Sequence, residues 1–300
     1  MTDLSIKKYG AIDIGSNAIR LLVSNIIIKK NKKTQFKKSS LVRVPIRLGA
    51  DAFVKGYISD ENITRMVEAM KAFQLLMNVH KVEKFKACGT SAMREAKNGS
   101  EVVEKILKET GIKIDIIEGK EEAAIISSTD LNELIRGENS YLYVDVGGGS
   151  TEFTVFSGGE IINSKSFKMG TVRLLNNRKS VNKEIFSNVE KWIKKNTKTL
   201  KNISLIGSGG NINKIFKMSG RTEGKPISFI YLNAQYQFLK QMSYQERISE
   251  LSLNPDRADV IIPATKIYLS AMKWSGASKI YVPKIGLSDG IIKSLYYNNL

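Results

Sequence analysis

The chain has 300 residues, about the length of two domains, and its 42% hydrophobic and 25% charged residues exclude a disordered or fibrous protein. No apolar run reaches the roughly 18 residues of a transmembrane helix, and residues 1–8 carry no signal-peptide core. With only one cysteine and one histidine, which exclude a disulfide framework and most Cys/His metal sites, we expect a cytoplasmic protein without a membrane partner.

Positive charge is the unusual feature of the composition. The 47 Lys and Arg residues outnumber the 29 Asp and Glu residues, which gives a net charge of +18. Such a field attracts polyanions such as polyphosphate, nucleic acid or anionic lipid, and it makes their binding depend on salt. A lysine-rich surface without a specific role explains the same charge, so composition alone does not identify the partner.

Two similar strand–turn–strand segments stand about one domain length apart. In the first, Asp13 precedes a Gly-Ser turn, and in the second, Asp145 precedes the turn Gly147-Gly148-Gly149-Ser150. An apolar strand comes before and after each turn, which predicts a β-hairpin in both places. The chain is therefore predicted to contain two related domains that begin in the same way.

The elements between these hairpins alternate along the chain. In the first half we predict a lysine-rich turn within 29–38, a strand over 41–48, helices over 59–78, 100–110 (with Ser100 as its N-cap) and 121–134, and strands over 84–87 and 113–117. In the second half we predict helices over 182–200, 210–218, 233–251 and 255–274, and strands over 204–206 and 279–282. The alternation predicts an α/β protein with mixed sheets and a domain boundary within 120–137.

Glycine-rich turns are the first candidates for chemistry. Glycine lets several backbone N–H groups point at one spot and bind phosphate oxygens, and the aspartate before the turn can hold a cation beside them. Gly209 and Gly210 belong to a third such turn, between an apolar strand and a helix, which is an anion-binding arrangement. Ordinary hairpins and a plain helix start remain the structural alternatives.

Polar side chains at other turns also indicate phosphate chemistry. Arg94, close to the hydroxyls of Thr90 and Ser91, offers a planar fork for phosphate; a helix cap with a surface ion pair is the alternative. Glu121 and Glu122 stand at a helix start, where one of them can be a general base or both can simply interact with the helix dipole. Spacing alone does not choose between them.

Asp145 and Glu152 lie on either side of the second turn. In a tight hairpin the two strand ends come close, so both carboxylates can share one divalent ion. Hydrolysis of a phosphoanhydride needs such an ion, positioned phosphate oxygens and an oriented water.

These segments together resemble the exopolyphosphatase / guanosine pentaphosphate phosphatase family of the actin-like superfamily, in its short two-domain form. The resemblance rests on blocks in family order over nearly the whole chain: residues 11–23, 89–98, 117–123, 144–152, 169–174, 254–263 and 285–291. It implies a hydrolase that releases terminal phosphate from polyphosphate or the 5′ γ-phosphate of guanosine pentaphosphate. It also implies two actin-like (ribonuclease H-like) domains with a cleft between them: residues 1–125 plus a C-terminal helix at about 292–300, and residues 126–291.

The resemblance also implies roles for individual residues. Glu122 matches the family's catalytic base, and Asp145 and Glu152 match the residues that hold Mg²⁺, or another divalent cation, and the attacking water. The residues implied to bind phosphate are Gly147, Gly148, Gly149 and Ser150, opposite Asp13, Ser16, Asn17 and Arg94, with Gly209 and Gly210 in the third glycine turn. A homodimer is expected, and specific binding of nucleic acid is not.

The sequence departs from the family pattern near the C-terminus. Ser288 and Asp289 stand where the pattern has Arg and Glu, and Asn211 stands where it has Thr. The loss of one cation weakens the expectation of polyphosphate hydrolysis, so a non-catalytic polyanion or nucleotide sensor stays an alternative, as does another actin-like kinase or ATPase. We expect an exit groove for the substrate to include some of Arg173, Arg178, Lys179 and Lys214.

Overall fold

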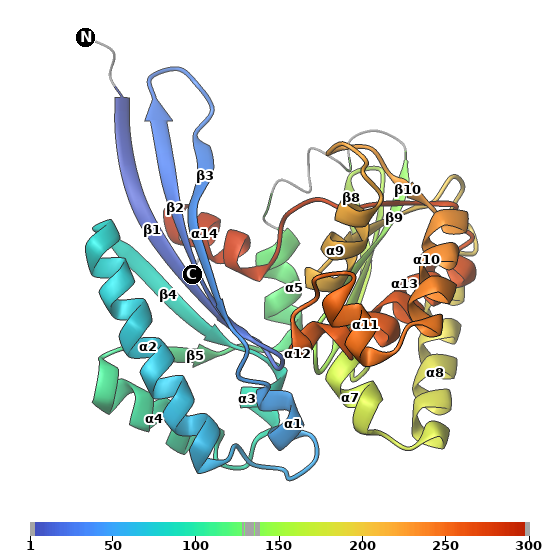
Figure 1. Cartoon of the computed structure of the whole chain (residues 1–300). Helices are drawn as coiled ribbons and strands as arrows, with labels where there is room; N and C mark the ends of the chain where they lie inside the picture. Colours follow the sequence, from blue (N-terminus) through green and yellow to red (C-terminus); the bar gives the residue numbers. More distant parts are fainter. Residues whose placement is uncertain (1–3, 128, 130–134, 136–138, 298–300) are drawn as a thin grey trace. The chain divides into compact units, whose positions relative to one another are not determined.

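The computed structural model describes residues 4–127, 129, 135 and 139–297. The chain divides into two compact units, which are Met1–Thr129 with Ile285–Leu300, and Asp130–Lys284 (Figure 1). In the described ranges, no helix has both the length and the apolar character needed to cross a membrane.

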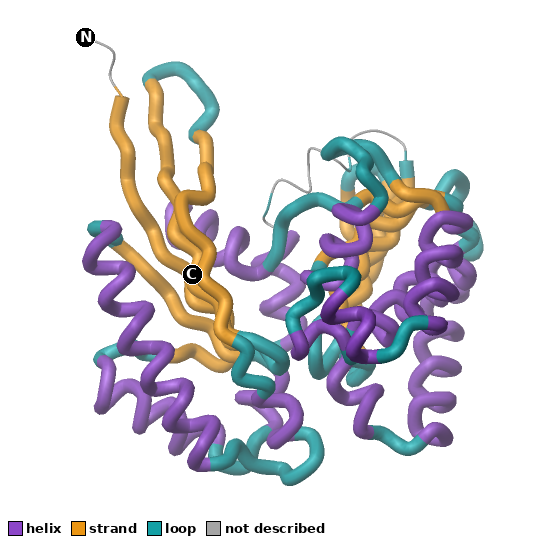
Figure 2. Tube along the Cα trace, viewed as in Figure 1, coloured by secondary structure: helices purple, strands orange, loops and turns teal. Residues whose placement is uncertain are grey.

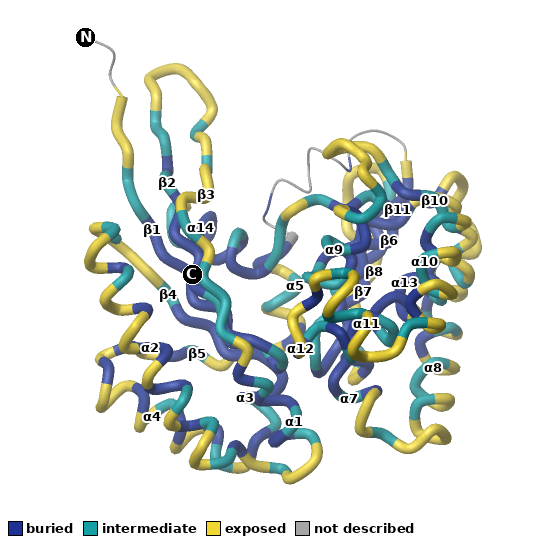
Figure 3. Tube along the Cα trace, in the orientation of Figure 1, coloured by how far each residue is buried: buried dark blue, intermediate teal, exposed yellow. Residues whose placement is uncertain are grey.

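Unit 1 is built on a mixed sheet in the order β3-β2-β1-β4-β5. The strands are β1 (Leu4–Ile14), β2 (Ile19–Lys29), β3 (Gln35–Val44), β4 (Lys84–Gly89) and β5 (Ile114–Ile116). The first three are antiparallel neighbours, whereas β4 and β5 run parallel to β1. In both β1 and β2 the buried residues gather in the part of the strand nearer the connecting turn (Figure 3), so the buried core of this sheet lies toward the glycine turn.

Helices cover the sheet of unit 1. The long ones are α2 (Asp60–His80), α4 (Gly99–Thr110) and α14 (Leu287–Tyr297); the others are α1 (Leu48–Ala52), α3 (Ser91–Glu95) and α5 (Gly119–Ser127). Helix α2 packs on α4 and β2, while α14 packs on α5, β1 and β4. Ser59 caps α2 by accepting a hydrogen bond from the Asn62 N–H, as its position before the apolar periodicity predicts.

Unit 2 is built on a second mixed sheet in the order β10-β11-β9-β6-β7-β8. Figure 2 draws the strands in orange and the helices in purple. Its strands are β6 (Ser140–Val146), β7 (Thr151–Ser157), β8 (Glu160–Phe167), β9 (Ser204–Ser208), β10 (Ile227–Ser228) and β11 (Lys279–Tyr281). Its helices are α7 (Thr171–Asn176), α8 (Lys179–Thr197), α9 (Gly210–Met218), α10 (Phe229–Gln241), α11 (Tyr244–Ser249), α12 (Pro255–Ala258) and α13 (Ile261–Ser275). As in unit 1, a meander of antiparallel strands is extended by parallel ones.

Several predicted elements differ from the structure. The strand predicted over 41–48 runs from Gln35 to Val44, because pairing with β2 draws Lys37 and Lys38 out of the predicted turn. The single helix predicted over 233–251 is two helices, since Ser243 and Glu246 form a capping box that starts a new one. Pro263, which suits a first helical turn, accompanies a second break in the helix predicted over 255–274.

Other boundaries shift by a few residues. The N-cap of α4 is Asn98, and Ser100 lies inside the first turn. Strand β8 and helix α7 were not predicted. The C-terminal helix begins at Leu287 rather than near 292, and both its predicted end at 300 and residue 134, the predicted end of the helix from 121, lie outside the described residues.

Candidate active site

The two glycine hairpins predicted from the sequence are present and have the same geometry. In unit 1 the Gly15 N–H donates to the Ala18 carbonyl at 3.2 Å, and in unit 2 the Gly147 N–H donates to the Ser150 carbonyl at 3.0 Å. Each aspartate lies directly opposite the residue seven positions later, on the same face of its sheet. The two hairpins differ in the charge of that opposite residue.

In unit 1 the opposite residue is a cation. Arg20 Nη1 lies 3.0 Å from Asp13 Oδ2, and Asp13 is buried. Burial raises the pKa of Asp13, and the Arg20 guanidinium opposes that rise. Asp13 is therefore neutralised within its own hairpin, so its carboxylate is a poorer candidate for holding a metal ion than Asp145.

The turn after β1 lies against two other turns of unit 1. Ser16 Oγ is 3.0 Å from Ser91 Oγ at the start of α3. The Ser16 carbonyl accepts the Gly49 N–H at 2.7 Å, and the Asn17 carbonyl accepts the Arg47 N–H at 3.0 Å. Ser16 and Asn17, both predicted to bind phosphate, thus lie beside Ser91 and Arg47. The sequence analysis did not single out Arg47.

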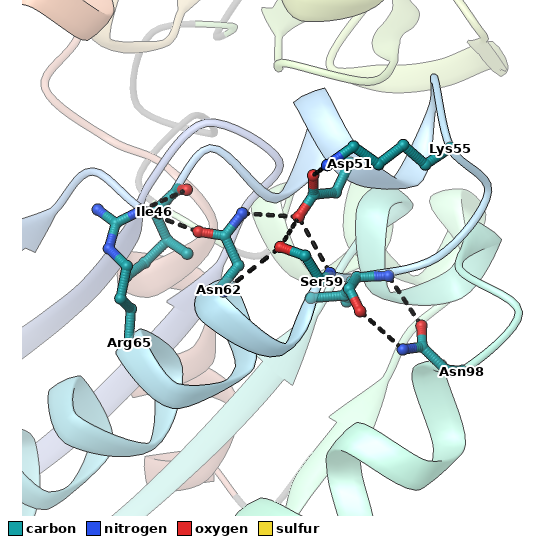
Figure 4. Close-up of polar contacts among 8 residues, drawn as sticks. Ile46, Asp51, Lys55, Ser59, Asn62, Arg65 and Asn98 are labelled. Carbon is teal, nitrogen blue, oxygen red and sulfur yellow. Dashed lines mark hydrogen bonds and ion pairs between the residues drawn. The ribbon is translucent and has the colours of Figure 1, made fainter.

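A buried polar network holds the backbone next to Arg47 (Figure 4). Asp51 Oδ2 accepts hydrogen bonds from Ser59 and from Asn62 Nδ2, the latter at 2.8 Å. Asn62 Oδ1 in turn accepts from Arg65 at 2.8 Å, and Arg65 donates to the carbonyls of Pro45 and Ile46. Arg47 has φ 63°, a left-handed conformation that costs a non-glycine residue energy, so these bonds hold a strained loop against the turn.

Arg94 and Glu122 both belong to unit 1. Arg94 Nη1 donates to the Ile117 carbonyl at 2.5 Å, and Arg94 Nε lies 3.7 Å from a carboxylate oxygen of Glu118, just before α5. On α5, Glu121 is exposed, whereas Glu122 is partly buried and its Oε2 atom is out of contact with solvent. Burial favours Glu122 over Glu121 as the base, the choice that spacing left open.

Unit 2 carries a row of polar side chains across its sheet. Asp145 lies opposite Glu152, and Ser208 and Ser166 are the next cross-strand neighbours on either side. Glu152 is 2% exposed, and its Oε1 accepts hydrogen bonds from Ser150 Oγ at 2.6 Å and Ser166 Oγ at 2.8 Å. The predicted closeness of Asp145 and Glu152 is confirmed at the level of strand register.

The donor set of this row fits a magnesium ion. Two like charges directly opposite each other destabilise a sheet, unless a cation lies between them. Mg²⁺ is usually held by one or two carboxylates together with waters and substrate phosphates, rather than by an all-protein cage. Among the residues that the structure describes, no group of three or more His, Cys, Asp or Glu side chains that could hold a metal ion is found.

The second glycine turn presents backbone donors beside this pair. Among the described residues, no acceptor is found for the N–H groups of Gly148, Gly149 and Ser150. Arg173, on α7, donates from Nε to the Gly149 carbonyl at 2.9 Å, so it supports the turn rather than standing free in a groove. Adjacent backbone N–H groups on a glycine-rich turn are donors of the kind that bind phosphate oxygens.

The third glycine turn also approaches Asp145. Gly209 has φ 120°, and a Cβ there would lie 3.7 Å from Asp145 Oδ1 and 3.0 Å from the Val146 carbonyl, so glycine is required. A Cβ on Gly210, at the start of α9, would lie 2.9 Å from Arg257 Nη2. Arg257 therefore adds a cation to this helix N-terminus, a role that the sequence analysis missed because the two positions are far apart in the chain.

The other three residues predicted to line an exit groove lie on α8 and α9 or directly before α8. Lys214 on α9 donates to the Leu251 carbonyl at 2.7 Å, and burial lowers its pKa, with Lys217 and Arg257 adding to the effect. Arg178 is the N-cap of α8, and Lys179 is its first residue. Whether any of them contacts substrate stays a prediction.

A known protein family and several known proteins are similar to this chain. Residues 27–298 match the model of the Ppx/GppA phosphatase family. The chain is 31% identical over 300 residues to a bifunctional 3-dehydroquinate synthase/phosphatase of Fusobacterium nucleatum, an alignment that covers 91% of this chain and 44% of that protein. The chain thus spans less than half the length of this relative.

Two further relatives match along nearly their whole length. Exopolyphosphatase 2 of Mycobacterium tuberculosis is 24% identical over 322 residues, covering 97% of this chain and 99% of that protein. The crystal structure of an exopolyphosphatase from Cytophaga hutchinsonii superposes with a TM-score of 0.85 at 24% identity, covering 97% and 98% of the two chains. This likeness confirms the predicted actin-like fold of two mixed sheets flanked by helices. Since the family match spans most of its length, the chain belongs to the Ppx/GppA phosphatase family.

Proposed function

We propose that this protein is a phosphoanhydride hydrolase that releases the terminal phosphate of inorganic polyphosphate or the 5′ γ-phosphate of guanosine pentaphosphate. The observation that carries the proposal is the pairing of Asp145 with buried Glu152 beside the N–H groups of the second glycine turn. Family membership supports the same reaction class. The substrate classes are those that the resemblance implies.

Each group has a defined task in this proposal. The N–H groups of Gly148, Gly149 and Ser150 bind the terminal phosphate, and the helix start at Gly210 with Arg257 binds further phosphate oxygens. Asp145 and Glu152 hold the Mg²⁺ ion, which when bound neutralises charge on the phosphate oxygens. Ser150 and Ser166 fix the Glu152 carboxylate through their hydrogen bonds.

Glu122 is the proposed general base. It takes a proton from the attacking water while the water oxygen bonds to the terminal phosphorus and the anhydride P–O bond breaks. The products are orthophosphate and a substrate shortened by one phosphate. The partial burial of Glu122 favours this role, because its Oε2 atom is shielded from bulk solvent, whereas Glu121 is exposed.

The decisive experiment compares Glu122→Gln with Glu121→Gln. Phosphate release from polyphosphates of defined length and from guanosine pentaphosphate is measured with and without Mg²⁺. We expect Glu122→Gln to lower kcat about 10²- to 10⁴-fold, with an unchanged circular dichroism spectrum. Its exposed neighbour should keep kcat within about twofold. Equal rates in the two variants would contradict the assignment of Glu122 as the base.

A polyanion or nucleotide sensor without catalysis is the second candidate. Asp289 is engaged within unit 1, because its carboxylate accepts the Gly286 N–H at 3.0 Å and pairs with Lys38 at 2.8 Å. Ser288 is buried. Two of the three positions that depart from the family pattern are thus buried or held by contacts within unit 1. Saturable substrate binding with no phosphate release under any divalent cation would favour this candidate.

A further inference from the structure

Unit 2 carries a groove of about 460 Å³ between β8 and α8. It is lined by Lys165, Phe167, Asn188, Lys191, Trp192 and Lys195. The four helical residues recur at spacings of three and four, which places them on one face of α8. Lys165 and Phe167 alternate with Ser166 along β8 and therefore project from the opposite face of the sheet.

This groove is distinct from the candidate active site. Ser166 faces Glu152, to which it donates a hydrogen bond at 2.8 Å. Lys165 lies opposite Phe153, on the other face of the same sheet. A ligand in the groove is thus separated from the carboxylate pair by the thickness of the sheet.

The base of the groove is aromatic. The rings of Phe167 and Trp192 meet edge to face with centroids 5.9 Å apart, and both side chains are half-buried. Lys165 Nζ lies 4.9 Å from the centre of the Phe167 ring. Such a surface suits a flat, π-rich group, and aromatic side chains stack with nucleobases.

The rim of the groove is cationic and uncompensated. Within the described ranges, no carboxylate pairs with Lys165, Lys191 or Lys195. The nearby Glu190 instead pairs with Lys194, which does not line the groove. Three ammonium groups without a carboxylate partner, around an aromatic base, complement a ligand that carries both an aromatic ring and several negative charges.

From these features we infer that the groove between β8 and α8 is a second ligand site, which binds a mononucleotide through its base and its phosphates. The base lies against Trp192 and Phe167, and the phosphates contact Lys165, Lys191 and Lys195. The volume is that of a small-molecule site rather than of a polymer track. The site goes beyond the proposed hydrolysis and does not depend on it.

Tryptophan fluorescence tests the site locally. The chain has two tryptophans, so Trp274→Phe leaves Trp192 as the only reporter. The protein is titrated with GTP and with inorganic tripolyphosphate in EDTA, which keeps divalent cations out of the proposed active site. We expect saturable quenching by GTP, with at least fivefold tighter binding than tripolyphosphate, because a stacked base contributes about 1 kcal/mol or more.

Matched lysine variants test the contacts. Lys191→Ala with Lys195→Ala should weaken GTP binding about tenfold. Lys183→Ala with Lys198→Ala removes the same charge from exposed positions of α8 and its C-cap outside the groove, and should change binding less than twofold. Equal losses in the two pairs, equal affinity for GTP and tripolyphosphate, or no saturable signal would each overturn the proposal. If Trp274→Phe does not fold, calorimetric titration of the unchanged protein and the two lysine pairs gives the same comparison.

Discussion

The residue seven positions after each hairpin aspartate sets the charge of its turn. Arg20 neutralises Asp13 in unit 1, whereas Glu152 adds a second negative charge beside Asp145 in unit 2. The same backbone design therefore gives a charge-neutral turn in unit 1 and an acidic turn, the one proposed to bind a cation, in unit 2. This difference makes unit 2 the better candidate for the metal.

Replacing Glu152 by Gln tests whether the metal binds in unit 2. The variant removes the repulsion from Asp145 while an amide oxygen can still accept from Ser150 and Ser166. Without Mg²⁺, the free energy of unfolding should stay the same or rise by about 0.5 kcal/mol. Added Mg²⁺ should raise the Tm of the unchanged protein but not of the variant, and phosphate release should fall about 100-fold or more.

Thermal unfolding with and without Mg²⁺ gives the measurement, and the exposed Glu160→Gln serves as the control. A variant that still responds to Mg²⁺ like the unchanged protein would place the metal elsewhere.

Asp51 gives a residue-level prediction about pH. Burial by itself would raise the pKa of Asp51, but hydrogen bonds from Ser59, Lys55 and Asn62 outweigh it and hold the pKa at about 2. A carboxyl whose pKa is lower in the folded state stabilises the fold above its unfolded pKa and loses that contribution as pH falls toward the folded pKa.

We therefore expect part of the acid sensitivity of unfolding between about pH 5 and pH 2 to disappear in Asp51→Asn. At neutral pH this variant should cost about 1–3 kcal/mol, because it weakens a charged acceptor of several hydrogen bonds. Denaturant unfolding of both proteins across this pH range gives the comparison. Parallel pH profiles would show that Asp51 does not contribute as a charged group.

At the scale of elements, the contact between α14 and α5 positions the proposed base. A Cβ on Gly290 would lie 2.3 Å from the Ile125 carbonyl oxygen of α5, which is closer than real atoms approach. Glu122 is one turn before Ile125 on the same helix. The close packing of these two helices therefore fixes the helix that carries Glu122.

Gly290→Ala should push α5 away from α14 and destabilise the fold by about 1–3 kcal/mol. It should also lower kcat more than it raises KM, because it moves the base rather than the phosphate-binding turns. Gly286→Ala is the matched control, since nothing lies within 4 Å of the Cβ it would add. Steady-state kinetics and denaturant unfolding of both variants test this prediction. Similar changes in stability and kcat in the two variants would show that the contact between Gly290 and Ile125 carries no strain.

On the scale of the whole molecule, the net charge of +18 acts over longer distances than any single contact. A long polyphosphate reaches more of this positive surface than a short one, and each neutralised charge adds to the salt dependence of binding. Raising salt from about 50 to about 200 mM should raise KM for long chains about tenfold or more, and for tripolyphosphate by less than about threefold. Phosphate release at the two salt concentrations measures this, and an equal change for both lengths would show that only the local site attracts substrate.

Features that depend on short spacing along the chain could be predicted from the amino-acid sequence. Hairpins form between neighbouring strands, so the pairing of Asp145 with Glu152 followed from seven positions and a glycine turn. The start of α9 at Gly210 followed for the same reason, since strand, glycine turn and helix are adjacent. The resemblance to the family implied roles for these positions and for Glu122.

Contacts between groups that are distant in the chain could not be predicted in this way and are known from the folded structure. Arg257 lies against Gly210, Asp289 pairs with Lys38, and Arg47 meets Asn17, each across a long stretch of chain. Burial of Glu122 rather than Glu121 depends on which side of α5 packs, and the groove beside Trp192 needs β8 and α8 together. Local patterns carry no information about such contacts, because the side chains on either side of each contact are brought together by the packing of whole elements.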